Sequence, residues 1–133
     1  VFLRKISDKV SCGGESMGLA CEMRCKNRVL IVRMQGELDH HTAENLREEI
    51  IQQKELSNCI HIIMNFQNLS FMDSSGLGVV FGRFKQIRSQ GGELVVCSIP
   101  PSIHRIFEMS GLYKVVPYVN NEEAALDFLG VTK

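Results

Sequence analysis

The sequence predicts a single-domain α/β protein, in which helices cover a mixed sheet. Three observations predict this fold. Short apolar runs alternate with segments of helical spacing, the first two runs follow each other without a helix between them, and 133 residues suffice for one core. Strands that are joined through helices run parallel, whereas two strands that are joined by a short turn run antiparallel.

The first two strands are expected to form a hairpin. Alternating apolar residues predict strands over 19–25 and 29–34, and the polar residues 26–28 suit the turn between them. Gly36 would close the second strand, so we expect a loop over 37–42. The hairpin would supply the antiparallel part of the sheet.

A helix and a buried strand come next. Apolar residues at helical spacing predict the helix, with Asp39 or Thr42 as its N-cap; they are Ala43, Leu46, Ile50 and Ile51. The almost continuous apolar run 59–66 predicts a strand that is covered on both faces. We expect a polar loop over 67–72 after it.

A second helix and a further strand repeat this alternation. The helix follows residue 73 and ends before Gly91-Gly92, because apolar residues recur at helical spacing; they are Leu77, Val80, Phe81, Phe84 and Ile87. The apolar residues of segment 93–98 predict the strand.

Three short elements complete the predicted fold. Pro100-Pro101-Ser102 opens a short helix. Val115-Val116 would be a strand at the edge of the sheet, because Pro117 follows it. A last helix over 122–129 would be capped by Asn121.

The composition excludes several classes of protein. Fifteen basic and fifteen acidic residues cancel, so the chain lacks the positive charge of nucleic-acid binders. No stretch approaches the roughly 20 apolar residues that cross a bilayer, and the first residues lack an apolar run of signal-peptide length. We therefore expect a cytoplasmic protein that binds neither nucleic acid nor membranes.

The first sixteen residues differ from the rest of the chain. Residues 1–16 show no sustained periodicity and contain Gly13-Gly14. We interpret them as a flexible N-terminal arm or an expression remnant. The domain itself is then expected over 17–133.

The cysteines indicate a reducing compartment and no metal site. Their number is odd and their spacing fits no disulfide framework, so we expect reduced thiols, with Cys59 and Cys97 buried in strands. Cys21 and Cys25 could form half of a metal site, but the sequence offers no second pair of ligands nearby. We therefore predict no bound metal ion.

Enzyme motifs are scarce as well. The chain has neither the phosphate-binding loop GxxxxGK[ST] nor the GxSxG elbow of serine hydrolases. The chain contains the residue types of a catalytic triad in Ser74, His41 and Asp39. A sequence does not give the geometry that such a triad requires. We predict a protein that is not an enzyme.

The strongest functional signal is the turn Asp73-Ser74-Ser75-Gly76, where a buried strand leads into an amphipathic helix. In one interpretation the turn is structural, with Asp73 or Ser74 as N-cap and Gly76 allowing close packing. In the other it accepts a phosphoryl group, because a helix N-terminus tolerates added negative charge. Phosphate would then change the stability of the fold by about 0.3–1 kcal/mol. In a tight interface it would lower the affinity for a partner by a factor on the order of a hundred.

Three segments of the chain form a family pattern, namely GELDHHTAE at 36–44, LSFMDSSGLG at 69–78 and GGELVVC at 91–97. They resemble STAS-domain anti-sigma factor antagonists, in particular those of the sporulation sigma-F pathway. The segment IFEMSGL at 106–112 extends the resemblance, which covers residues 17–131. It implies a STAS fold, which is a mixed sheet of about four to five strands with four helices packed mainly on one side.

The resemblance also implies a partner-switching function. The unphosphorylated protein would bind the anti-sigma F factor, a serine kinase with bound ATP or ADP, and so release sigma-F. The kinase would phosphorylate Ser74 and end the complex, and a serine phosphatase would reset it. No cofactor is implied for the antagonist itself. The partner-binding residues would be Asp39, Asp73, Ser75 and Gly76.

Three alternatives stay open on the sequence. The chain could be an antagonist of the stress-response type, or a STAS scaffold that is never phosphorylated. It could also be a small nucleotide-hydrolysing enzyme that uses Asp73.

Overall fold

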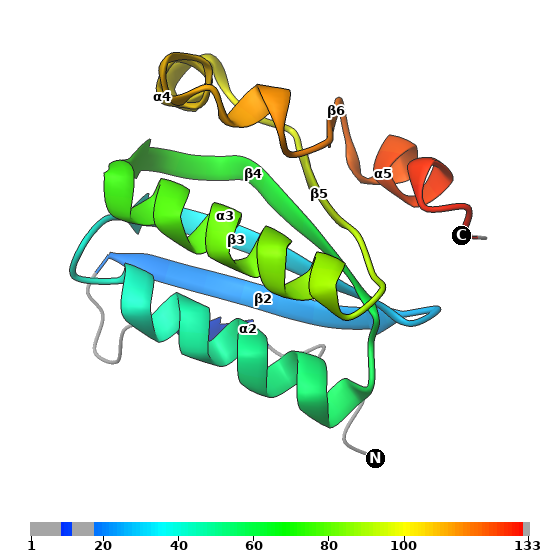
Figure 1. Cartoon of the computed structure of the whole chain (residues 1–133). Helices are drawn as coiled ribbons and strands as arrows, with labels where there is room; N and C mark the ends of the chain where they lie inside the picture. Colours follow the sequence, from blue (N-terminus) through cyan, green and yellow to red (C-terminus); the bar gives the residue numbers. More distant parts are fainter. Residues whose placement is uncertain (1–8, 12–17, 132–133) are drawn as a thin grey trace.

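The strands of the protein form one mixed sheet (Figure 1). The structure is a computed structural model that describes residues 9–11 and 18–131. Its strands are β1 (Lys9–Ser11), β2 (Leu19–Lys26), β3 (Val29–Leu38), β4 (His61–Met72), β5 (Leu94–Cys97) and β6 (Tyr118–Val119). They lie in the sheet in chain order. The pairs β1–β2 and β2–β3 are antiparallel, and the pairs from β3 to β6 are parallel. The predicted mixed sheet is confirmed.

The strands from β2 to β5 correspond to predicted strands, β6 begins after the predicted position, and β1 is an additional strand at the edge. It pairs with β2 and lies within residues 1–16, the predicted arm. The rest of that segment lies outside the described residues. The boundary between arm and domain therefore stays a prediction.

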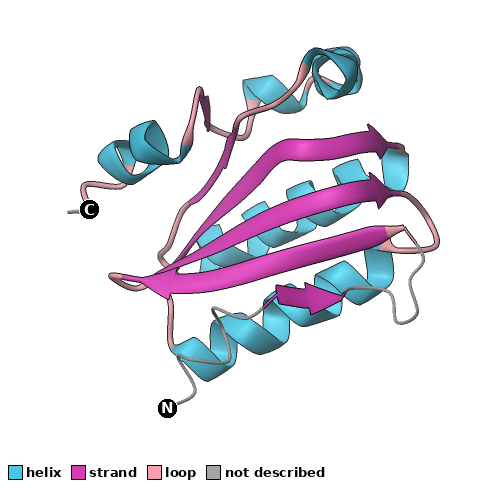
Figure 2. Cartoon of the chain, turned by 180° about the vertical axis from the view of Figure 1, so that it is seen from behind, coloured by secondary structure: helices cyan, strands magenta, loops and turns pink. Residues whose placement is uncertain are grey.

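Of the described helices, three cover one face of the sheet and a fourth packs on the other. The helices are α2 (Ala43–Ser57), α3 (Ser74–Ser89), α4 (Pro101–Ser110) and α5 (Glu122–Phe128), and the 3₁₀ turn η1 (Leu112–Lys114) follows α4. Residues of α2, α3 and α4 share one large core, whereas α5 packs over a smaller cluster on the opposite face. Figure 2 shows the strands in front of α2 and α3. The expected packing, mainly on one side, is confirmed. In the described part of the chain, no helix combines the length and apolarity needed to cross a membrane.

The central strands alternate between the two cores. In β3, Leu30 and Val32 belong to the large core, whereas Val29 and Ile31 pack with residues of α5. Because both faces are covered, the sequence of such a strand reads as a continuous apolar run.

The predicted loop over 67–72 is strand, whereas the predicted loop over 37–42 is strand in its first two residues and a loop in the rest. β3 continues to Leu38 and β4 to Met72, where loops were expected over 37–42 and 67–72. The two strands stay paired to these ends, with irregular register on the way. Met72 faces the core and the polar residues before it are largely exposed, while the backbone remains in the sheet. Polar composition alone was therefore a poor indicator of a loop.

The strand predicted at Val115-Val116 is wrong, because pairing starts at Tyr118. Val116 is buried just after η1. Pro117 has no N–H to donate to a strand ladder, but its carbonyl accepts a hydrogen bond from the Val96 N–H at 3.0 Å. The predicted edge position is confirmed, because β6 lies at the end of the sheet.

The cysteines also depart in part from the expectation of reduced thiols. A disulfide joins Cys25 to Cys59, whose Cα atoms lie 6.8 Å apart, so the expectation is wrong for this pair. The two residues are distant in the sequence, but the hairpin turn and the start of β4 are neighbours, since the Ile60 N–H donates to the Arg28 carbonyl. Cys97 is a buried free thiol, as expected, and burial raises its pKa to about 11.

Candidate functional site

The two polar segments that the sequence singles out meet at one edge of the sheet. β3 and β4 are parallel, so their carboxyl ends lie side by side, with Leu38 opposite Met72. The Asp73 N–H donates to the Leu38 carbonyl at 3.2 Å. The loop from β3 into α2 and the turn from β4 into α3 are therefore neighbours, and both helices begin at this edge (Figure 1).

Asp73 is the N-cap of α3. Its Oδ1 accepts a hydrogen bond from the Ser75 N–H at 2.8 Å, and its carbonyl accepts one from the Gly76 N–H at 3.0 Å. Of the two predicted caps, Asp73 is thus the correct one. Ser74 is exposed as the first residue of the helix, whereas Ser75 is half-buried. Ser74 is therefore the more accessible of the two serines.

Gly76 lies buried in the first turn of α3. A Cβ at this position would collide with the Met72 side chain and come within 3.0 Å of Leu38 Cδ2. A larger residue would push the start of α3 away from the ends of β3 and β4. The close packing expected of Gly76 is confirmed, and its contact with a partner stays a prediction.

Asp39 organises the loop before α2. Its Oδ1 accepts hydrogen bonds from the N–H groups of His41 at 2.9 Å and Thr42 at 3.2 Å. Burial raises the pKa of the Asp39 carboxyl, but these hydrogen bonds outweigh burial and hold the pKa below its ordinary value. Thr42 is the N-cap residue of α2. Asp39 is thus an ionised, half-buried carboxylate at the same edge as Ser74.

The edge at Asp39, Asp73 and Ser74 is polar. The Asp39 carboxylate accepts a hydrogen bond from the backbone N–H of His41. In a catalytic triad the carboxylate instead accepts a hydrogen bond from the imidazole of the histidine. Over residues 9–11 and 18–131, no three His, Cys, Asp or Glu side chains gather into a possible metal site.

An apolar groove begins at Ser74 and runs between α3 and α4. Its first part has a volume of about 390 Å³, and its lining includes Ser74, Leu77, Ile106 and Met109. A second hollow of about 340 Å³ shares Leu77 with the first and extends to Phe81 and Val115. Met109 is 75% exposed. We call this surface the α3–α4 groove.

The α3–α4 groove is not among the predicted sites, although its residues carry a signal in the sequence. Helical spacing assigns both Leu77 and Phe81 to the core face of α3. In the structure Phe81 is exposed and Leu77 is half-buried. The apolar stripe of α3 is therefore wider than its contact with the sheet, and this excess width is typical of a helix with a second apolar partner.

Known proteins of similar sequence place the chain in a family. Residues 20–125 match the family model of the STAS domain. The chain is 48% identical over 115 residues to an anti-sigma F factor antagonist of Paenibacillus polymyxa, and the alignment covers 86% of this chain and 98% of that protein. An anti-sigma F factor antagonist of Lysinibacillus sphaericus is 37% identical over 83 residues, which are 62% of this chain and 71% of that protein.

Solved structures agree with the sequence comparison. The anti-sigma factor antagonist SpoIIAA in its unphosphorylated form matches with a TM-score of 0.70 and 31% identity, over 85% of this chain and 99% of that chain. The Bacillus cell fate determinant SpoIIAA in its phosphorylated form matches with a TM-score of 0.63 and 33% identity, over 79% and 96% of the two chains. The chain therefore belongs to the STAS-domain family, as a SpoIIAA-like member of its anti-sigma factor antagonists.

Proposed function

We propose that this protein is a partner-switching antagonist of the sporulation type. Its unphosphorylated form binds the anti-sigma F factor, a serine kinase that carries ATP or ADP, and thereby releases sigma-F. The kinase phosphorylates Ser74, the complex dissociates, and a serine phosphatase restores the binding form. The antagonist acts in the cytoplasm, catalyses no reaction itself and contacts neither nucleic acid nor membrane.

The position of Ser74 is the observation that carries this proposal. Ser74 is exposed at the first residue of α3, and Asp73 supplies the helix cap, so a phosphate on Ser74 would leave the cap hydrogen bond in place. Ser74 also lines the apolar α3–α4 groove. A phosphate there would have to lose its water against the partner, which weakens binding strongly.

The same phosphate would have little effect on folding. The start of α3 favours negative charge by about 0.3–1 kcal/mol. The neighbouring Asp73 carboxylate opposes this gain by like-charge repulsion. Phosphorylation would therefore act on the interface and leave the domain folded.

The relatives support the same role. Two of the proteins that the chain resembles are anti-sigma F factor antagonists, and SpoIIAA has been solved in both unphosphorylated and phosphorylated forms. We assign Asp39, Asp73 and Ser75 as partner contacts, because they lie with Ser74 at one edge of the sheet. Gly76 contributes by letting the turn lie close to β3 and β4.

A kinase assay tests the phosphoacceptor. The protein is incubated with its cognate anti-sigma F factor and ATP, and its intact mass is measured for the wild type, Ser74→Ala and Ser75→Ala. We expect one added phosphoryl group on the wild type and on Ser75→Ala, and none on Ser74→Ala. Phosphate on Ser74→Ala, or its absence from Ser75→Ala alone, would overturn the assignment. A wild type that binds the kinase but is never phosphorylated would point instead to a STAS scaffold.

A further inference from the structure

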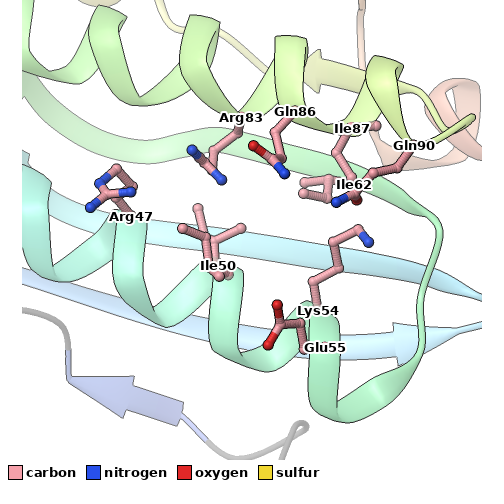
Figure 3. Close-up of a pocket in the computed structure, with 10 residues that line it drawn as sticks. Arg47, Ile50, Lys54, Glu55, Ile62, Arg83, Gln86, Ile87 and Gln90 are labelled. Atoms are coloured by element: carbon pink, nitrogen blue, oxygen red, sulfur yellow. The ribbon is translucent and has the colours of Figure 1, made fainter.

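A second groove lies on the other side of α3, facing α2 (Figure 3). It has a volume of about 150 Å³. Arg83 and Gln86 reach into it from α3, and Lys54 reaches into it from α2. Its floor is apolar and includes Ile50 and Ile62. We call this surface the α2–α3 groove.

Arg83 is buried without a partner for its inner nitrogen. The residue is only 9% exposed, and its Nε has no hydrogen-bond partner within the described part of the chain. Burial is the main cause that lowers the pKa of the guanidinium, the like charge of Arg47 lowers it further, and the carboxylate of Glu44 opposes part of this shift. A buried guanidinium nitrogen without a hydrogen-bond partner is costly to the folded state, so such a group normally has one.

Arg33 shows how this protein accommodates a guanidinium that serves the fold. Its Nε and Nη2 donate to the two carboxylate oxygens of Glu122 at 2.7 and 2.8 Å, although Arg33 is less buried than Arg83. The hydrogen bonds that Arg33 donates to Glu122 raise the pKa of Arg33, whereas the pKa of Arg83 is lowered. Of the two, the more buried arginine thus has the poorer electrostatic environment.

The lining of the α2–α3 groove is positive. Arg47, Lys54 and Arg83 are basic, and Glu55 is the acidic residue among the lining side chains. Arg47 is partly neutralised by Glu44, which accepts two hydrogen bonds from it at 2.7 and 3.2 Å. Lys54 points from α2 toward α3, and Arg83 points from α3 toward α2, so net positive charge lies between the two helices.

The volume limits the size of a ligand. Pockets for drug-sized molecules are typically about 300–1,000 Å³, so a groove of about 150 Å³ excludes a nucleotide. A tetrahedral or planar oxyanion fits, and its oxygens could accept hydrogen bonds from a guanidinium, an ammonium and the side-chain amides of Gln86 and Gln90.

We propose that the α2–α3 groove binds a small oxyanion, of the phosphate or carboxylate type, with Arg83 as its principal ligand. The anion completes the hydrogen bonding of the buried guanidinium and neutralises the charge that Arg83 and Lys54 leave between the helices. The site is separate from Ser74 and does not depend on its phosphorylation.

An NMR titration of the full chain tests the proposal. Sodium phosphate or sodium acetate is added to ¹⁵N-labelled protein, with sodium chloride adjusted to hold the ionic strength constant. We expect a saturable shift of the Arg83 Nε–Hε resonance and of the Gln86 and Gln90 side-chain amides. Saturation by phosphate alone identifies a phosphoryl-type ligand, and saturation by acetate alone identifies a carboxylate. No saturable shift of the Arg83 resonance with either anion would overturn the proposal.

Variants on α3 provide the controls. Arg83→Met keeps the aliphatic volume and should raise the dissociation constant at least about tenfold, whereas Arg83→Lys keeps the charge without the guanidinium fork and should have an intermediate effect. Arg88→Met removes the same charge from an exposed position outside the groove and should bind like the wild type. Equal affinity in Arg83→Met and the wild type would also overturn the proposal, because the anion would then bind elsewhere.

Discussion

The two grooves beside α3 differ in polarity, and therefore in the kind of ligand that each could bind. The α3–α4 groove is apolar and well exposed, so an apolar surface of a partner would fit it. The α2–α3 groove is narrow and positively charged, so a small anion would fit it. One helix can therefore present a protein-binding surface on one side and an ion-binding surface on the other, and single substitutions can separate the two.

The largest expected effect follows from adding charge at the mouth of the α3–α4 groove. Ser74→Asp should weaken binding to the anti-sigma F factor by a factor on the order of a hundred, because a carboxylate must be desolvated in the interface. The melting temperature should stay near that of the wild type, since position 74 is exposed at a helix N-terminus. Calorimetric titration and thermal unfolding measure the two quantities.

Ser74→Asn is the matched control, because it has nearly the size of aspartate without the charge. It should retain most of the affinity. Equal losses in Ser74→Asp and Ser74→Asn would show that size, not charge, is excluded, and a parallel loss of folding would contradict an interface mechanism.

A smaller effect is expected from the apolar lining of the same groove. Met109→Ala should weaken binding about tenfold, because Met109 is 75% exposed in the free protein and available to a partner. Its free energy of unfolding should change by less than about 0.5 kcal/mol. Leu56→Ala removes another exposed apolar side chain, from the far end of α2, and should leave the affinity unchanged. If the two variants bind alike, the α3–α4 groove is not the contact surface.

The smallest effect concerns how Arg83 and Arg33 contribute to the free energy of unfolding, measured by urea unfolding in phosphate-free buffer. Arg83→Met should leave the free energy of unfolding unchanged or raise it by up to about 1 kcal/mol, because it removes a buried charged group whose Nε has no hydrogen-bond partner. Arg33→Met should lower it by about 1 kcal/mol, because Glu122 loses the partner of a half-exposed ion pair. A larger loss in Arg83→Met than in Arg33→Met would mean that Arg83 has a structural partner.

The effect of Arg33→Met should also depend on pH. Hydrogen bonds from Arg33 lower the pKa of Glu122 below its ordinary value of 4.5, despite burial. A carboxyl with a depressed pKa adds stability above its unfolded pKa and loses this contribution as the pH falls through its folded pKa. The stability difference between the wild type and Arg33→Met should therefore be constant near neutral pH and shrink below about pH 4.5. A difference that does not change with pH would mean that the pair is not electrostatic.

Local signals made most of the fold predictable. Asn121 caps α5, accepting a hydrogen bond from the Ala124 N–H at 2.8 Å, as its place before an acidic helical turn indicates. The start of α3 was predictable in the same way, because capping depends on adjacent residues, although the sequence left Asp73 and Ser74 open as the cap. The strand character of residues 67–72 was not predictable, since it comes from pairing with β3, about thirty residues earlier in the chain.

The environment of Arg83 likewise could not be predicted fully from the sequence. A charged residue is left out of any apolar pattern, so its burial between two helices is not expected from its type. Its spacing from Val80 and Ile87 nevertheless places it on the buried face of α3. The position could have been predicted from the sequence, but the missing partner depends on how far α2 lies from α3 and needs the structure.

The order of the strands has a consequence for how the protein is made. In the described part of the chain, each strand lies next to its neighbour in the sequence, so every pairing closes one hairpin or one β-α-β crossover. During synthesis, strands that pair in the sheet therefore leave the ribosome one after another, without a distant segment between them. The edge at Asp39 and Asp73 exists once β3 and β4 have paired, before α4 has left the ribosome. Ser74, the proposed acceptor, therefore leaves the ribosome before α4, the helix that completes the α3–α4 groove.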